Sequence, residues 1–271
     1  MTRFDDGPET LLPSGDVTEG VVRVGETVRR PHQDTSDGVA EYLAHLEQVG
    51  FVGAPQYLGR DAQGRDVLSY LDGVVAGDPV EHWAAVDDVL PDVAALVRRL
   101  HDASEGWVPA SRLGWQHAGR PVPPLPEREP RLVSHRDVTP QNVVFRGGQA
   151  FGLIDFDLVG WTTRSLDLAN TAMHWIPLRD PRDREPVYAG ADVARRLRLI
   201  LEAYGTDRVS PRQLLDAAQL RFGALYDSMR WNAQHLGGGW ARMWSAGVGE
   251  VITRRADWFS AVRDEFAHAL G

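Results

Sequence analysis

The chain contains no cysteine, which excludes a disulfide framework, a thiolate metal site and a thiol nucleophile. Its first residues, MTRFDDGPET, lack the apolar core of a secretory signal. No apolar run approaches the length that spans a bilayer. We therefore expect a soluble, cytoplasmic protein that has no membrane partner.

Basic residues are in the minority: 29 Lys and Arg stand against 38 Asp and Glu, a formal net charge of −9. Nucleic acids and anionic membranes need a basic face, so neither is expected as a partner. The acidic balance is weakly compatible with a cationic substrate. With 271 residues, 43% of them hydrophobic, the chain can form one large domain or two lobes that share a cleft.

Several catalytic signatures are also missing. The sequence has no G-x-x-x-x-G-K-[ST] phosphate loop, no G-x-S-x-G nucleophile elbow and no H-E-x-x-H zinc motif. These absences disfavour Walker-type NTPases, α/β hydrolases and zinc proteases.

The first 72 residues read as strands, turns and one helix. Short β-prone runs at 21–24 and 27–30 are separated by Gly25-Glu26, which predicts a hairpin. Apolar residues at helical spacing over 39–49 end at Gly50, and 67–71 reads as a strand.

The rest of the chain reads as mainly helical. Six prolines between Gly106 and Pro130 indicate a loop that crosses a surface. Residues 132–134, 143–145 and 151–154 read as short strands, the last two joined in a hairpin, and from Ala191 onward the pattern is helical. We predict an α+β, two-lobe protein with a small β-rich lobe (1–72), a larger helical lobe (73–271) and a cleft between them.

The most informative stretch is Ser134-His135-Arg136-Asp137-Val138-Thr139-Pro140-Gln141-Asn142, followed by Ile154-Asp155-Phe156-Asp157 after a hydrophobic strand. Phosphoryl transfer needs positioning and cancellation of phosphate charge. A carboxylate must orient the acceptor hydroxyl, and Mg²⁺ prefers carboxylate and amide oxygens. Asp137, Asn142 and Asp155 supply these groups.

These residues resemble a known pattern. His135-Arg136-Asp137 with Asn142 is similar to the H-R-D-x-x-x-x-N catalytic loop of kinases, and Asp155 begins the segment that stands where kinases carry D-F-G. The resemblance implies that Asp137 is the catalytic base, that Asn142 and Asp155 hold Mg²⁺, and that His135 braces the catalytic loop.

The spacing after Asp155 indicates which group of kinases the chain resembles. Eleven residues separate Asp155 from Asp167-Leu168-Ala169, and there is no A-P-E. The chain thus resembles the aminoglycoside phosphotransferase and choline-kinase-like family, including a trifolitoxin-immunity-like bacterial subgroup whose label names a phenotype and not a substrate. This implies a protein-kinase-like fold, with Asp167 bonding the catalytic loop from behind. Asp157 reads as a surface turn residue or a second metal contact, and the role of Arg136 is open.

The phosphate-binding lysine of kinases is absent from strand 27–30, so an arginine must replace it. Only one of Arg29 and Arg30 should face the cleft, because side chains alternate along a strand. Resemblance to relatives with a V-L-R-x-P strand favours Arg29. Glu41 is the candidate partner of this arginine, with Glu47 as a rival.

Nucleotide binding is expected at two further places. Gly15 and Gly20 belong to a loop that lets backbone amides approach phosphates. By resemblance, adenine would bond to backbone groups of the linker from Ser69 to Leu71. The implied cofactors are Mg²⁺ and ATP (or GTP), and the implied partner is a small molecule with a free hydroxyl.

The acceptor is not identified by any motif. An aminoglycoside-type antibiotic kinase, a kinase of an amino alcohol or sugar, and a catalytically weak immunity or binding protein on the same fold all fit. The segment from Trp231 to Trp240 reads either as an aromatic acceptor pocket or as packing.

Overall fold

The computed structural model describes residues 7–12, 20–110 and 120–271. Within them, the first part of the chain forms an antiparallel sheet of order β1-β2-β3-β5-β4. Its strands are β1 (Thr10–Leu11), β2 (Val22–Val24), β3 (Thr27–Arg30), β4 (Tyr57–Arg60) and β5 (Asp66–Ser69). The β2–β3 hairpin confirms the predicted turn at Gly25. One helix, α1 (Ser36–Gln48), follows β3 and buries an apolar stripe that includes Val39, Tyr42 and Leu46.

The second part of the chain is mainly helical. Its helices are α2 (His82–Ala85), α3 (Leu90–Ser104), α4 (Arg164–Trp175), α5 (Val193–Tyr204), α6 (Pro211–His235), α7 (Gly238–Ser245) and α8 (Val248–Leu270). Short 3₁₀ turns lie at Asp87–Val89, Phe156–Leu158, Pro181–Asp183 and Pro186–Tyr188. No helix in the described ranges is long and apolar enough to cross a membrane.

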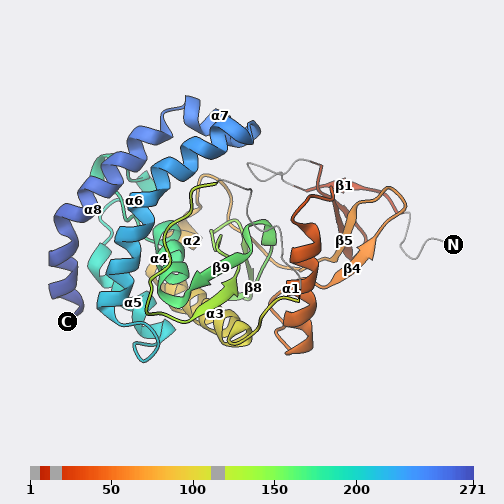
Figure 1. The fold of residues 1–271 in the computed structure, drawn as a ribbon, viewed down its shortest axis with the longest axis horizontal. Coiled ribbons are helices and arrows are strands. Elements are labelled where there is room, and N and C mark those ends of the chain that lie inside the picture. Colours follow the sequence, from red (N-terminus) through yellow and green to blue (C-terminus); the bar gives the residue numbers. More distant parts are fainter. Residues whose placement is uncertain (1–6, 13–19, 111–119) are drawn as a thin grey trace.

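Two small antiparallel sheets lie between these parts. β6 (Arg131–Ser134) pairs with β9 (Gly160–Thr163), and β7 (Val143–Arg146) pairs with β8 (Gln149–Leu153). The β7–β8 hairpin was predicted, whereas β9 was not. In Figure 1 the five-stranded sheet and α1 occupy one end of the molecule and α6–α8 the other, with β8 and β9 between them.

Local sequence explains the start of the longest helix. Ser210 caps α6: its hydroxyl accepts a hydrogen bond from the backbone N–H of Gln213, whose side chain accepts one from the Ser210 N–H. Pro211 occupies the first turn, where no N–H is needed. This capping box fixes the position at which α6 begins, and α6 lies against α4, α7 and α8.

Two connections join the sheet to the helical part. Gly73 follows β5 with φ 145°, and a Cβ there would lie 2.4 Å from Val144 Cγ1, so only glycine fits. Val74 and Phe145 then exchange backbone hydrogen bonds of 3.0 and 2.7 Å. On the other side, the buried Tyr42 hydroxyl lies 2.7 Å from Ser104 Oγ, which ties α1 to α3. The division at residue 72 stays a prediction.

Candidate active site

The loop after β6 is held by its histidine. His135 is fully buried, its Nε2 donates to the Ile154 carbonyl at 2.9 Å, and its Nδ1 accepts from the Asp137 N–H at 3.2 Å. This pair of contacts requires the neutral ring, and burial lowers the pKa of His135 accordingly. His135 therefore positions Asp137 and joins the loop to the end of β8.

Asn142 holds the other side of the same carboxylate. Its Nδ2 donates to both the Asp137 carbonyl and Asp137 Oδ2, each at 3.0 Å. Burial raises the pKa of Asp137 to about 6, although Arg221 and Asn142 oppose the shift. Asp137 is thus a mostly ionised carboxylate at neutral pH, with a basicity suited to accepting a proton.

Asp155 lies beside Asn142. The Ile154 N–H donates to the Asn142 carbonyl at 2.9 Å, which brings the end of β8 to the catalytic loop. Asp155 has a left-handed backbone, φ 62°, and its side chain is 39% exposed. Partial burial, and then the neighbouring Asp157 carboxylate, raise the pKa of Asp155. The strained backbone turns this carboxylate toward the cleft.

The donor set of these two residues fits Mg²⁺. Both bonds of Asn142 use Nδ2, which leaves its amide oxygen as a ligand atom beside the Asp155 carboxylate. In the described ranges, no three His, Cys, Asp or Glu side chains gather into a metal cluster. That is expected for a cation that takes most of its oxygens from phosphates and water.

The arginine that reaches this site is Arg30. Its guanidinium lies 3.5 Å from Asp155 Oδ1 and is also paired with Asp157. Arg29 is on the opposite face of β3, where it bonds Thr27 and lies 3.8 Å from Asp61. Strand alternation thus places Arg30, and not Arg29 as expected, beside Asp155. Phosphate binding by either arginine stays a prediction. Asp157 is not a plain surface residue, since it pairs across the cleft.

The two candidate glutamates, both on α1, make contacts with residues other than Arg29 and Arg30. Glu41 Oε1 accepts from the Ala110 N–H at 2.5 Å, and Glu47 Oε1 accepts from Gln56 Nε2 at 2.7 Å. These contacts connect α1 to the start of the proline-containing segment and to the loop before β4. Pairing of Glu41 with the phosphate-binding arginine stays a prediction.

The residues expected at the nucleotide are only partly placed. Gly20, φ 80°, lies two residues before the start of β2, which pairs with β1, whereas Gly15 lies outside the described residues. At the linker, the Ser69 N–H already donates to Gln56 at 2.9 Å and the Tyr70 N–H to Glu26 at 2.8 Å. Of the three linker residues, Leu71 is therefore the one whose N–H is not used in these two bonds.

A buried network supports the catalytic loop from behind. Asp167, in the first turn of α4, accepts from Ser134 Oγ at 2.7 Å and lies 2.9 Å from His101 Nε2. His101 is fully buried on α3 and also bonds the Tyr204 hydroxyl at 2.8 Å. The role suggested for Asp167 thus has a geometric basis. His101 was not predicted as the partner of Asp167, because the two residues are 66 positions apart in the chain.

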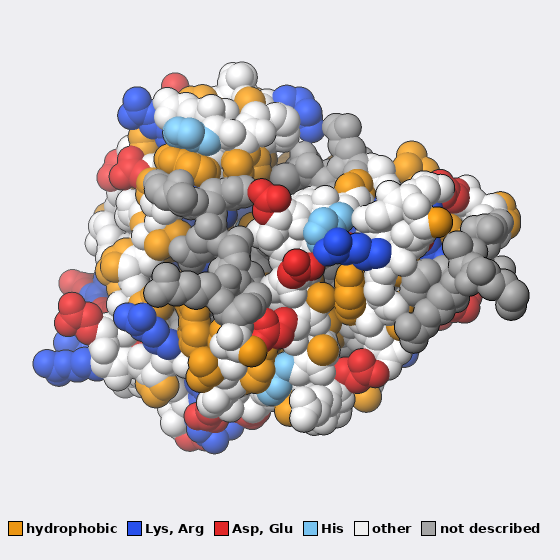
Figure 2. Space-filling model, turned by 45° about the vertical axis from the view of Figure 1, so that its right-hand side comes forward, with side chains coloured by type: hydrophobic (Ala, Val, Ile, Leu, Met, Phe, Trp, Pro, Cys, Tyr) orange, Lys and Arg blue, Asp and Glu red, His pale blue; other side chains and the backbone are white. Residues whose placement is uncertain are grey.

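The cleft beside Asp137 has a volume of about 1240 Å³. Its walls come from the catalytic loop, from α4, α6, α7 and α8, and from residues 120–125. Ser228 Oγ donates to the Pro121 carbonyl at 2.7 Å, so the proline-containing segment is anchored to α6 and forms a wall of the cleft. Figure 2 shows side chains of both charges and histidines gathered between the two ends of the molecule.

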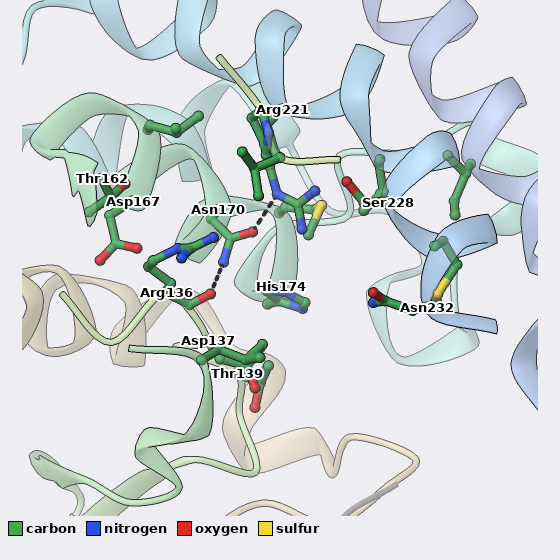
Figure 3. A pocket seen from close by; sticks show the side chains of 18 of the residues that line it. Arg136, Asp137, Thr139, Thr162, Asp167, Asn170, His174, Arg221, Ser228 and Asn232 are labelled. Carbon is green, nitrogen blue, oxygen red and sulfur yellow. Dashed lines mark hydrogen bonds between the residues drawn. The ribbon is translucent and has the colours of Figure 1, made fainter. Parts of the chain in front are cut away.

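Asn170 and Arg221 are site residues that the sequence did not suggest. Asn170 Nδ2 donates to the Arg136 carbonyl, and its Oδ1 accepts from Arg221 Nε, each at 2.8 Å (Figure 3). Arg136 has a left-handed backbone with φ 65°. The Asn170 bond fixes the Arg136 carbonyl, and hence the peptide that leads into Asp137.

Known proteins share this sequence and geometry. The phosphotransferase enzyme family matches residues 109–202. The trifolitoxin immunity protein of Rhizobium leguminosarum bv. trifolii is 33% identical over 206 residues, which are 74% of this chain and 75% of that protein. The chain belongs to the phosphotransferase enzyme family. The resemblance stated from the motifs is thereby confirmed.

Solved structures show the fold of this phosphotransferase. A choline/ethanolamine kinase family protein from Mesorhizobium loti superposes with a TM-score of 0.57 at 17% identity, covering 98% of this chain and 91% of that one. The GDP complex of aminoglycoside 2′-phosphotransferase-IIIa gives a TM-score of 0.60 at 15% identity, covering 94% of each chain. The predicted kinase-like α+β fold is confirmed.

Proposed function

We propose that this phosphotransferase moves the γ-phosphoryl group of ATP or GTP to a hydroxyl of a small molecule. The observation that carries the proposal is the convergence of Asp137, Asn142 and Asp155 at one edge of the cleft. Asn142 bonds the Asp137 carboxylate through its side chain and the Ile154 N–H through its carbonyl. Asn142 thus positions the Asp137 carboxylate, which is the proposed base, and brings the residue before Asp155 to the catalytic loop. Its own amide oxygen and the Asp155 carboxylate are the proposed metal ligands.

Each residue has a distinct task in the transfer. Asp137 orients the acceptor hydroxyl and takes its proton, while the acceptor oxygen bonds to the γ-phosphorus and the bond to the leaving nucleoside diphosphate breaks. Asn142 and Asp155 would hold Mg²⁺, which when bound would neutralise phosphate charge. Arg30 contacts the phosphates, and His135 keeps Asp137 in position.

The nucleotide base would lie against the linker between the sheet and the helical part. With the N–H groups of Ser69 and Tyr70 engaged, we assign the donor to the base to Leu71 and acceptor positions to the linker carbonyls. Gly20, and Gly15 before it, would flank the phosphates. ATP and GTP differ in the groups that they present at this linker, so the choice between them is an experimental one.

The relatives suggest two classes of acceptor and one alternative function without turnover. Aminoglycoside-type antibiotics and amino alcohols are suggested by the names of solved structures with the same fold. A catalytically weak immunity function is suggested by the relative that carries that name. The complete set of Asp137, Asn142 and Asp155 supports catalysis over binding alone.

The test has two stages. In the first, the melting temperature of the chain is measured with ATP, GTP and ADP, each with and without Mg²⁺; a metal-dependent rise is expected. In the second, nucleotide consumption is followed with a panel of aminoglycosides, macrolides, amino alcohols and sugars. Asp137→Asn and Asp155→Asn should each lower turnover by about 10²–10³-fold, while Asp227→Asn, an exposed position on α6, should not.

Stabilisation by nucleotide without turnover of any acceptor would favour the immunity or binding function. Absence of any nucleotide effect, or full turnover by both active-site variants, would refute the proposal.

A further inference from the structure

Arginines from four parts of the chain line the cleft on the acceptor side of Asp137. Arg120 lies in the segment before β6, Arg136 in the catalytic loop, Arg221 on α6 and Arg255 on α8. In Figure 3 the side chain of Arg221 extends from α6 toward Asn170 and the centre of the pocket, above Asp137. Four arginines thus gather in one cleft of a chain whose net charge is −9.

The four arginines have no salt-bridge partner in the part of the chain that the structure describes. In the described part of the chain, none of them has an Asp or Glu oxygen within salt-bridge distance. Arg221 donates its Nε to the neutral amide of Asn170 at 2.8 Å. The buried Nε atoms of Arg120 and Arg255 have no hydrogen-bond partner among the described residues, and Arg255 is only 8% exposed.

The acids that line the cleft are Asp78, Asp137, Asp155, Asp157, Asp167 and Glu185, and four of them face other partners. Asp155 and Asp157 face Arg30, and Asp167 is bonded by Ser134 and His101. Glu185 lies 3.3 Å from Arg179. Asp137 is the carboxylate left near Arg221, and the proposed reaction requires it as the base. Binding an acceptor must therefore compensate the arginines with a group that the chain does not provide.

The arginines also lower the pKa values of neighbouring groups, in addition to the effect of burial. Burial, and then Arg221, Arg255 and Arg179, lower the pKa of His174 to about 3. Burial, and then Arg136 and Arg120, lower the pKa of Arg221 to about 10. Like charges that repel one another in a partly dry cleft create a site that an anion stabilises.

We propose that the acceptor carries a carboxylate or phosphate group in addition to its hydroxyl, and that this anionic group binds between Arg120, Arg136 and Arg221. The inference rests on the proposed function and narrows its acceptor. Arginine forks bind carboxylate and phosphate oxygens in pairs, so they fix orientation as well as affinity. Anchored there, the acceptor presents its hydroxyl to Asp137, the residue next to Arg136.

The same charges act against a polycationic acceptor. The ammonium groups of an aminoglycoside would enter a pocket in which four arginines form no salt bridge with the described residues, and like-charge juxtaposition discriminates strongly against such a ligand. The aminoglycoside and amino-alcohol classes are thereby disfavoured. A hydroxylated acid or a phosphorylated sugar is the favoured class, and the weak expectation of a cationic substrate from net charge is replaced.

The test compares matched probes of different charge on the full chain. Melting temperature and heats of binding are measured with inorganic phosphate, gluconate, sorbitol and glucosamine, at fixed ionic strength and with saturating ADP and Mg²⁺ to occupy the nucleotide site. At least one of phosphate and gluconate should bind. The anion that binds more tightly shows whether the acceptor's anionic group is a phosphate or a carboxylate. Sorbitol and glucosamine should bind at least about 10-fold more weakly.

The variants Arg120→Gln and Arg221→Gln should weaken that anion about 10- to 100-fold. Arg221→Lys should restore part of the affinity because it keeps the charge. Arg212→Gln, on the same helix with a side chain 89% exposed, is the matched control and should bind as the wild type does. Arg120→Gln removes a guanidinium whose Nε has no hydrogen-bond partner among the described residues, so it should fold even if Arg221→Gln does not.

Tighter binding of glucosamine than of both anions, failure of both anions to bind, or unchanged anion affinity in Arg120→Gln would overturn the inference. Asp155→Asn separates it from the proposed function. If this variant binds the anion normally while the wild type never consumes nucleotide, the anion site stands and phosphoryl transfer fails. If the wild type turns over only cationic acceptors, transfer stands and the anion site fails.

Discussion

Arg30 of β3 and Asp155 at the end of β8 lie 3.5 Å apart across the cleft. This ion pair connects the five-stranded sheet to the segment beside the catalytic loop, although the two residues are far apart in the sequence. Because the chain contains no lysine, an arginine must take the phosphate-binding position of a kinase. Arg30, whose side chain is 10% exposed, meets both requirements: it lies beside the proposed metal ligand and it keeps its charge at every relevant pH.

Arg30→Gln is expected to lower turnover by about 10²–10³-fold, because it removes a charge aimed at the phosphates. The measurement is kcat and KM for the nucleotide with an accepted acceptor. Arg29→Gln is the matched variant one residue away on the opposite face of β3; it should lower the melting temperature and leave kcat per folded molecule near the wild-type value. The reverse pattern would return the role to Arg29.

Asp167→Ala is expected to destabilise the fold by about 3–5 kcal/mol, because a fully buried carboxylate that accepts from Ser134 and His101 is lost. Urea denaturation followed by tryptophan fluorescence measures the free energy of unfolding. Asp216→Ala, half-exposed on α6, serves as the control and should cost about 1 kcal/mol or less. Equal losses in the two variants would contradict the buried network.

The same carboxylate predicts a pH dependence of stability. Burial alone would raise the pKa of Asp167, but hydrogen bonds from His101 and Ser134 outweigh it and hold the pKa below its ordinary value. Its contribution is therefore fully present above the unfolded pKa near 4 and is lost as the pH falls through the folded pKa.

The free energy of unfolding of the wild type should accordingly fall more steeply below about pH 4 than that of Asp167→Asn, which cannot titrate there. Parallel curves for the two proteins would show that Asp167 has no lowered pKa.

Gly160→Ala is expected to disturb the Arg136 guanidinium, because a Cβ at Gly160 would lie 2.3 Å from Arg136 Nη1. Anion affinity should fall, with a small change in melting temperature, since the neighbouring atom is the end of a long side chain. Gly223→Ala on α6 is the control: nothing lies within 4 Å of its Cβ position, and alanine should stabilise the helix by about 0.5–1 kcal/mol. Unchanged anion affinity in Gly160→Ala would place the Arg136 guanidinium outside the binding site.

Patterns that lie within one stretch of chain were predicted well. The hairpin at Gly25, the helix from Val39 and the β7–β8 hairpin follow from period-two or period-3.6 hydrophobicity and from turn residues. The spacing of Asp137, Asn142 and Asp155 indicated kinase chemistry because one loop and the next hairpin carry all three. β9 escaped prediction, since Gly-Trp-Thr-Thr has no clear alternation and exists as a strand through its pairing with β6.

The sequence by itself determined the phosphotransferase family, because the motif that marks it is short and its order and spacing do not depend on packing. Tertiary structure decided which arginine faces Asp155, which histidine supports Asp167, and that Arg120, Arg136, Arg221 and Arg255 meet in one cleft. Those relations join residues up to 135 positions apart, such as Arg120 and Arg255. Strand alternation and helix packing determine which of these distant residues meet. The net charge gives no information on them because it is a sum over the whole chain.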